Sequence, residues 1–204
     1  MADNDPNDVR WQVRAPGLVV EFHRLGDRWT HDVAVGPRGA PAVVAVAVEA
    51  DAERDGPTRV VSPTYQELDF ERGADRVGAL LLGQAGPHHF SAVFAVWEDP
   101  GQVGVVVDVA DRCRVPVESL ACTYRLDLPA AALRSADPGA IAWDLPGGRL
   151  EFMAKEPARV AVAEAGRRGT LVQAEAGIDS KSHTQRCLYR WLWTPDRSNP
   201  GARS

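Results

Sequence analysis

The feature that most constrains the fold of this chain is a pair of alternating apolar segments joined by a tight turn. Alternation runs from His89 to Trp97, and valines occupy every second position from Val103 to Val109. Between these segments, Asp99–Gln102 places proline and glycine where a type II turn requires them. Because a period of two residues is typical of a strand, this stretch predicts an antiparallel β-hairpin.

The same pattern of short apolar segments between turn residues continues through most of the chain. Further strands are predicted at Leu18–Leu25, Arg28–Val35, Val43–Val48, Pro63–Phe70, Arg76–Leu82, Leu120–Leu128 and His183–Thr194. Turns between paired strands are predicted at Gly26-Asp27, Arg72–Asp75, Pro146–Gly148, Glu156-Pro157 and Ala165–Gly169.

Three segments need separate comment. Val43–Val48 is apolar throughout, which predicts a strand buried on both faces. His183–Thr194 fits helical spacing as well as alternation, and its aromatic content favours a strand. Ala130–Arg134 follows a proline and predicts one short helical turn near Ala130.

Together these segments predict an all-β fold, a large antiparallel β-sandwich of about a dozen strands, because so many strands exceed one open sheet. Neither a repeat of fixed period nor a linker divides the chain, so residues 9–194 are predicted to form a single domain. Residues 1–8 are acidic, and residues 195–204 are rich in proline, glycine and small polar residues. Both ends are predicted to be disordered tails.

The net charge and the hydropathy pattern limit the classes of partner that this protein is expected to bind. The net charge is −5 and the basic residues are scattered, so neither nucleic acid nor an anionic membrane is expected. No apolar run approaches the roughly 20 residues of a membrane helix, and the first residues lack a signal-peptide pattern. A soluble, cytoplasmic protein is therefore expected, with a small-molecule or protein ligand and the oligomeric state left open.

The histidines are the first candidates for catalysis. His23 and His31 flank one predicted turn and are expected to be neighbours on one face of a hairpin, with Asp32 beside His31. His88 and His89 are adjacent, so they would point to opposite faces of a strand. Because the histidines lack the paired spacing of metal ligands, no metal site is expected, and surface or hydrogen-bonded histidine is the simpler interpretation.

A carboxylate pair is the second candidate. Glu67 and Asp69 share one face of a predicted strand with Tyr65. Their spacing is within the range that glycosidases use, although the polar face of any half-buried strand has the same pattern. The glycine-rich stretches Gly83–Gly86 and Gly101–Gly104 do not open a helix, so no phosphate-bearing cofactor is expected.

The cysteines and aromatic residues bear on the packing of the fold more than on catalysis. Three cysteines argue against a disulfide framework; Cys113 and Cys122 could pair across the turn-like Val115–Glu118 or remain buried free thiols. The aromatic residues of the last strand share one face: Tyr189, Trp191 and Trp193. Exposed, they would form a binding platform for a sugar or a protein; buried, they would be core.

Three hypotheses for function follow. The first is a non-catalytic ligand- or protein-binding module. The second is an enzyme that acts on a carbohydrate or similar small substrate through a histidine and a carboxylate. The third is a structural homo-oligomer. In its many short strands and few helices, the chain resembles the large sandwiches of galactose-mutarotase-like and other carbohydrate-associated proteins, which implies a carbohydrate-associated role.

Overall fold

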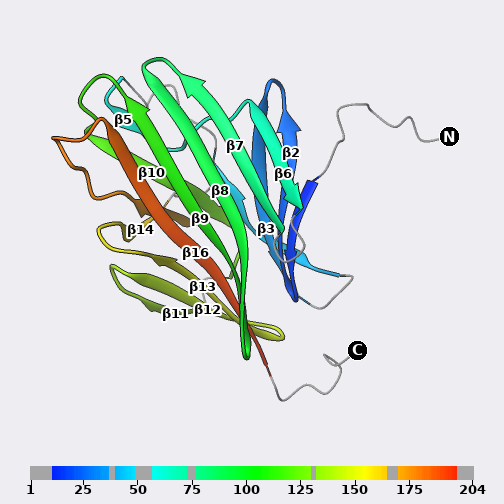
Figure 1. Ribbon diagram of the computed structural model, residues 1–204. Helices are drawn as coiled ribbons and strands as arrows, with labels where there is room; N and C mark the ends of the chain where they lie inside the picture. Colours follow the sequence, from blue (N-terminus) through cyan, green and yellow to red (C-terminus); the bar gives the residue numbers. More distant parts are fainter. Residues whose placement is uncertain are drawn as a thin grey trace.

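Two antiparallel β-sheets packed face to face make up the described part of the protein. A computed structural model describes residues 11–36, 40–48, 57–72, 77–129, 132–164 and 170–196. Figure 1 shows one sheet in front, where strands β8, β9 and β16 run side by side, and the second sheet behind it. The predicted all-β sandwich is confirmed, with eight strands in each sheet.

The first sheet carries the N-terminal strands. Its order is β1 (Trp11–Ala15), β2 (Leu18–Leu25), β3 (Arg28–Val35), β4 (Ala42–Ala47), β10 (Ser119–Leu126), β15 (Thr170–Glu175) and β14 (Arg159–Glu164). A short strand, β5 (Arg59–Val60), pairs in parallel with the start of β10.

The second sheet contains the longest strands. Its order is β11 (Leu133–Ala136), β12 (Ala140–Leu145), β13 (Gly148–Ala154), β16 (Thr184–Pro195), β9 (Gln102–Cys113), β8 (His88–Asp99), β7 (Val77–Ala85) and β6 (Glu67–Arg72). The β8–β9 hairpin has the predicted turn, in which Asp99 pairs with Gln102 and Gly101 has a φ of 91°. Only glycine adopts that φ without strain, which explains the glycine at this position.

The core is formed by the inward faces of both sheets. Trp191 of β16 is fully buried, and its ring lies 4.5 Å from Phe152 and 5.1 Å from Tyr124 between centroids. Trp193 is buried on the same face of β16. The final segment is therefore a strand, and its tryptophans are core residues rather than an exposed platform.

The prediction for Val43–Val48 was right about the strand and wrong about its burial. The pairing of β3 with β4 shifts between Val33 and Ala34, so that Val44 and Ala45 are both buried in succession. Val43 faces outward and is 47 % exposed. Such an irregularity resets the alternation of faces.

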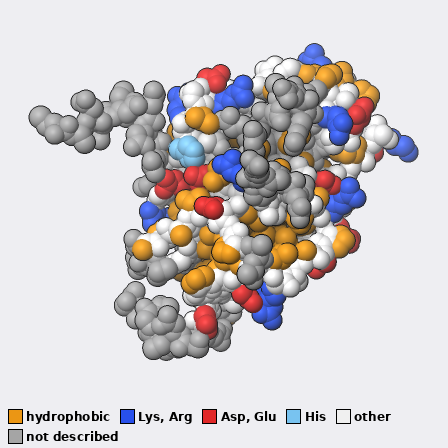
Figure 2. Space-filling view, turned by 180° about the vertical axis from the view of Figure 1, so that it is seen from behind, with side chains coloured by type: hydrophobic (Ala, Val, Ile, Leu, Met, Phe, Trp, Pro, Cys, Tyr) orange, Lys and Arg blue, Asp and Glu red, His pale blue; other side chains and the backbone are white. Residues whose placement is uncertain are grey.

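Figure 2 shows the side opposite to that of Figure 1, where hydrophobic side chains gather in the lower half and charged side chains are spread around them.

One predicted hairpin turn joins strands in a different way. Glu156-Pro157 leads from β13 in the second sheet to β14 in the first, so it connects the sheets and is not a hairpin. A proline turn marks a change of chain direction, but it does not select the partner of the next strand. β14 does pair with β15, although residues 165–169 of their predicted turn lie outside the described residues. Residues 73–76 between β6 and β7 lie outside them as well.

The helical turn and the C-terminal boundary also differ in detail. Leu133 and Arg134, the last two residues of the predicted helical turn, lie in β11. Just before them, the Ala132 N–H donates to the Pro129 carbonyl. Ala130 itself lies outside the described residues, as do the predicted tail residues 1–8 and 197–204. Pro195 ends β16, so the strand extends one residue into the segment predicted as a tail. One further main-chain hydrogen bond, from the Asp196 N–H to the Gly147 carbonyl, follows it. Within the described segments, no helix has the length and apolar character needed to cross a membrane.

The burial of Trp191 leads to a stability prediction. Replacing Trp191 with alanine should lower the free energy of unfolding by about 3–5 kcal/mol, because it removes a large side chain from a packed core and leaves a cavity. Urea unfolding followed by circular dichroism measures the change. Val162→Ala, at a half-exposed position on β14, is the control and should change stability little. A Trp191→Ala midpoint equal to that of the control would contradict the core role.

Candidate functional site

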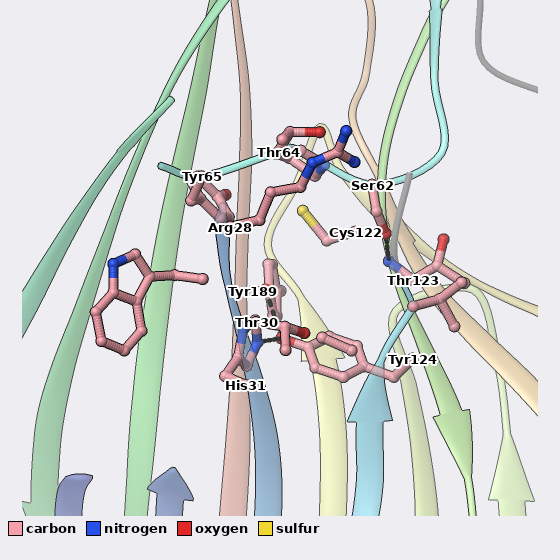
Figure 3. A pocket seen from close by; sticks show the side chains of 14 residues that line it. Arg28, Thr30, His31, Ser62, Thr64, Tyr65, Cys122, Thr123, Tyr124 and Tyr189 are labelled. Atoms are coloured by element: carbon pink, nitrogen blue, oxygen red, sulfur yellow. Dashed lines mark hydrogen bonds between the residues drawn. The ribbon is translucent and has the colours of Figure 1, made fainter. Parts of the chain in front are cut away.

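All three tyrosines of the chain line one pocket between the two sheets. Tyr124 comes from β10 of the first sheet, Tyr189 from β16 of the second, and Tyr65 from the segment before β6. Figure 3 shows them on different sides of the cavity, with Cys122 pointing into the space between them. The cavity volume is about 40 Å³, which corresponds to about three water molecules.

Strand alternation explains how these side chains come to face one another. Tyr124 and Cys122 are two residues apart on the inward face of β10, and Tyr189 and Cys187 repeat this spacing on β16. His31 of β3 pairs with Phe22, a fully buried residue, so His31 also points inward. Each residue thus obeys a period of two, and the packing of the sheets brings them together.

A continuous chain of hydrogen bonds crosses the interior. His31 Nε2 lies 2.8 Å from Tyr124 Oη, and Tyr124 Oη lies 2.7 Å from Tyr189 Oη. If His31 Nε2 carries no proton, Tyr124 donates to it and accepts from Tyr189; the opposite tautomer reverses both bonds. The chain can therefore present either a donor or an acceptor at its ends without any change in charge.

The wall that carries Tyr65 is held in place by main-chain hydrogen bonds. The Trp29 N–H of β3 donates to the Tyr65 carbonyl at 2.8 Å, and the Gln66 N–H donates to the Leu82 carbonyl of β7 at 2.9 Å. The segment thus links β3 of the first sheet to β7 of the second. It passes so close to Gly83 that a Cβ there would lie 2.7 Å from Tyr65 Cα and closer still to the Thr64 carbonyl. Glycine at this position allows the approach.

Polar side chains are concentrated at this pocket. Apart from tyrosine and cysteine, the described part of the chain buries eight polar or charged residues, and five of them line the cavity. These five are Thr30, His31, Ser62, Thr64 and Thr123. Thr123 is tied to the neighbouring segment, because its hydroxyl donates to the Val61 carbonyl at 2.7 Å. Since burial of polar groups is unfavourable without hydrogen bonds, such a concentration indicates a site rather than ordinary packing.

Burial keeps the lining groups uncharged. Desolvation, aided by the nearby His23, lowers the pKa of His31 to about 3, so its imidazole is neutral at physiological pH. Desolvation raises the pKa of Tyr65, Tyr124 and Tyr189. The neighbouring Cys187 thiol, together with burial, raises the pKa of Cys122. The interior of the pocket is therefore polar but neutral.

Arg28 is the one formally charged side chain among the described residues that line the pocket. Its side chain is 44 % exposed and lies 3.5 Å from Asp27, so it belongs to the solvent side of the cavity. Figure 3 shows it extending toward Thr64. Trp29 and Pro63 add apolar surface to the walls.

A second buried polar pair lies away from this pocket. His88 Nδ1 donates to Asp111 Oδ2 at 2.7 Å, between β8 and β9. Burial raises the pKa of Asp111, while the hydrogen bond from His88 opposes that rise. His88 Nε2 and Asp111 Oδ1 are buried without hydrogen-bond partners among the described residues. The arrangement orients an imidazole as in an acid–base dyad, but neither residue lines the pocket.

Of the remaining histidine predictions, the one for His23 and His31 is wrong and the one for His88 and His89 is confirmed. His23 pairs with Thr30, one residue out of register with His31, so the two histidines point to opposite faces. Instead, His23 Nδ1 lies 3.9 Å from Asp32 Oδ2. His88 is buried and His89 exposed, as alternation predicts. Within the part of the chain that the structure describes, no three histidine, cysteine or acidic side chains gather closely enough to hold a metal ion.

The carboxylate and cysteine predictions also have definite outcomes. Glu67 and Asp69 are exposed on β6, whereas Tyr65 is buried in the pocket wall, so the three do not form one face. All three cysteines are free and buried. Cys113 and Cys122 lie in different sheets, because the segment after β9 crosses to the first sheet rather than forming a hairpin.

Of the residues predicted to carry function, His31 and Tyr189 line the pocket, and Tyr65, Tyr124 and Thr64 were missed as site residues. A usable signal was present. Tyrosines at inward positions of apolar strands bring hydroxyls into a core, where they require partners.

Comparison with known proteins adds no functional assignment: no protein-family model and no curated protein matches this chain. The function must therefore be argued from the site itself.

The contact at Gly83 predicts that its replacement will damage the pocket. Gly83→Ala should lower the free energy of unfolding by about 1–3 kcal/mol, because the added methyl group must push the Tyr65 segment away from β7. Thermal or urea unfolding measures this effect. Gly139→Ala is a matched control, since a Cβ there meets only ordinary contact, 3.5 Å from Asp137. Equal stabilities of the two variants would show that the close approach is not needed.

The depressed pKa of His31 predicts a specific pH dependence of stability. Below pH 6.5 the unfolded chain takes up a proton at His31 that the folded protein does not bind until about pH 3, so stability is lost as the pH falls through this window. Between pH 7 and pH 5 the loss due to His31 should be about 2 kcal/mol. Urea unfolding of the wild type, His31→Gln and the exposed-site control His89→Gln measures it. Only His31→Gln should flatten the profile; parallel profiles for all three would refute the assignment.

Proposed function

We propose that the protein is a non-catalytic β-sandwich module that binds a small molecule in the pocket between its sheets. The observation that carries this proposal is the convergence of all three tyrosines and five further buried polar residues on one cavity. Concave sites with apolar walls and a few convergent polar groups are the usual form of small-molecule sites.

The hydrogen-bonding state of the lining supports a ligand. Thr30, Thr64 and Tyr65 are each more than nine-tenths buried, and their hydroxyls make no hydrogen bond to another described residue. These hydroxyl oxygens are not among the fully buried atoms that lack a partner, so they keep some accessible surface, and a ligand with polar atoms could form hydrogen bonds with them. The hydrogen-bonded chain ending at Tyr189 offers further donors or acceptors.

The electrostatics favour binding over acid–base catalysis. A general acid or base works best with a pKa near the operating pH. His31 and the tyrosines have pKa values moved away from neutrality by burial. Within the described lining there is also no carboxylate. The carbohydrate association expected from the sequence is compatible with this proposal, since sugars pair hydroxyls with aromatic rings, although a cavity of about 40 Å³ would take only one end of a sugar.

Removal of one lining hydroxyl tests the proposal. In a thermal-shift screen of small polar compounds, hits that stabilise the wild type should bind Thr64→Val about 5–10-fold more weakly by calorimetry, because a ligand hydrogen bond is lost. Thr184→Val, at an exposed position of β16, is the matched control and should bind as the wild type does. If no compound binds, or if both variants bind equally, the proposal fails.

A second candidate is an enzyme that uses His88 as a general base. It is supported by the His88–Asp111 hydrogen bond, which leaves the buried Nε2 without a partner among the described residues. Its test is hydrolysis of glycoside and ester substrates. Activity abolished by His88→Gln and retained in Thr64→Val would favour this candidate over the binding module.

A further inference from the structure

We infer that the pocket accepts the uncharged, hydrogen-bonding end of its ligand, a hydroxyl or carboxamide group, and excludes ionised groups. This inference rests on the proposed binding function and specifies the chemical class of the ligand. It follows from the charge, the hydrogen-bonding capacity and the size of the cavity.

The charge distribution excludes ions from the interior. Among the described lining residues, the formal charge is confined to Arg28, whose side chain is 44 % exposed. The polar groups that face the interior, including the hydroxyls of Tyr65, Tyr124 and Tyr189, are neutral. An ionised group placed among them would lose its hydration and meet no opposite charge, which weakens binding by at least about 100-fold. An anionic substituent is tolerated only on the outer part of the ligand, beside Arg28.

The hydrogen-bonding groups select a ligand end that both donates and accepts. Hydroxyls such as those of Thr64 and Tyr65 can do either, and the chain from His31 through Tyr124 to Tyr189 can reverse its direction. A hydroxyl or carboxamide matches such partners, whereas an apolar end would leave them buried and unpaired.

The cavity sets the size of the inserted end. A volume of about 40 Å³ corresponds to about three water-sized groups. A carboxamide or a short hydroxyalkyl group has this size. The rest of the ligand would then lie on the solvent side of the cavity, which includes Arg28.

Three probes of nearly equal shape separate charge from size: acetamide, acetate and acetamidinium. At pH 7 they are neutral, anionic and cationic. Saturation-transfer NMR with the full chain should detect acetamide, with a signal that Thr64→Val reduces and Thr184→Val does not. The two ions should bind at least about 100-fold more weakly, and so give no signal that depends on Thr64.

The outcomes distinguish this inference from the proposed function. A Thr64-dependent signal from acetate or acetamidinium as strong as that from acetamide would overturn the ligand class and leave the binding function standing. The absence of any Thr64-dependent signal from all three probes would overturn both. Circular dichroism of each variant confirms that it is folded, and Tyr65→Phe gives a second, independent lining variant for which the same loss of the acetamide signal is expected.

Discussion

A hydroxyl buried between two β-sheets needs a partner, and in this protein that need fixes how the sheets meet. The Tyr124 hydroxyl of the first sheet bonds to His31 in its own sheet and to Tyr189 in the opposing one. The rings of Phe152 and Trp191 pack edge-on against Tyr124 and hold it in position. Apolar packing alone tolerates small sliding of one sheet over the other, whereas a hydrogen bond between sheets specifies one alignment. The pocket is the space beside this bond.

The fold could be predicted to a large extent because most strands obey a period of two and end at recognisable turns. The alternating valines and the Pro100-Gly101 turn were enough to predict the β8–β9 hairpin. Two features depend on longer-range structure. The irregularity opposite Val44 arises from pairing between β3 and β4, and the passage of the chain at Pro157 from one sheet to the other depends on which strands the later segments find as partners. Local propensity determines neither.

The site was predictable only in part, for a related reason. Alternation shows that Tyr124 and Tyr189 face inward, but their meeting depends on which strands lie opposite each other once the sheets pack. For His23 and His31 a difference of one residue in register sends the side chains to opposite faces. Tyr65 lies outside any strand, and its position depends on main-chain bonds to Trp29 and on the space left by Gly83. Sequence patterns thus identify inward residues and do not identify which of them share a cavity.

The gathering of every tyrosine of the chain at one cavity has a practical consequence. Isotopic labelling of tyrosine alone would place reporter nuclei at three positions, Tyr65, Tyr124 and Tyr189, all on the walls of the pocket. Ring signals from such a sample would describe the pocket and nothing else in the molecule, in the unaltered protein. Ring-flip rates depend on the free volume around each ring. They would then report how tightly the pocket wall packs around each of the three tyrosines.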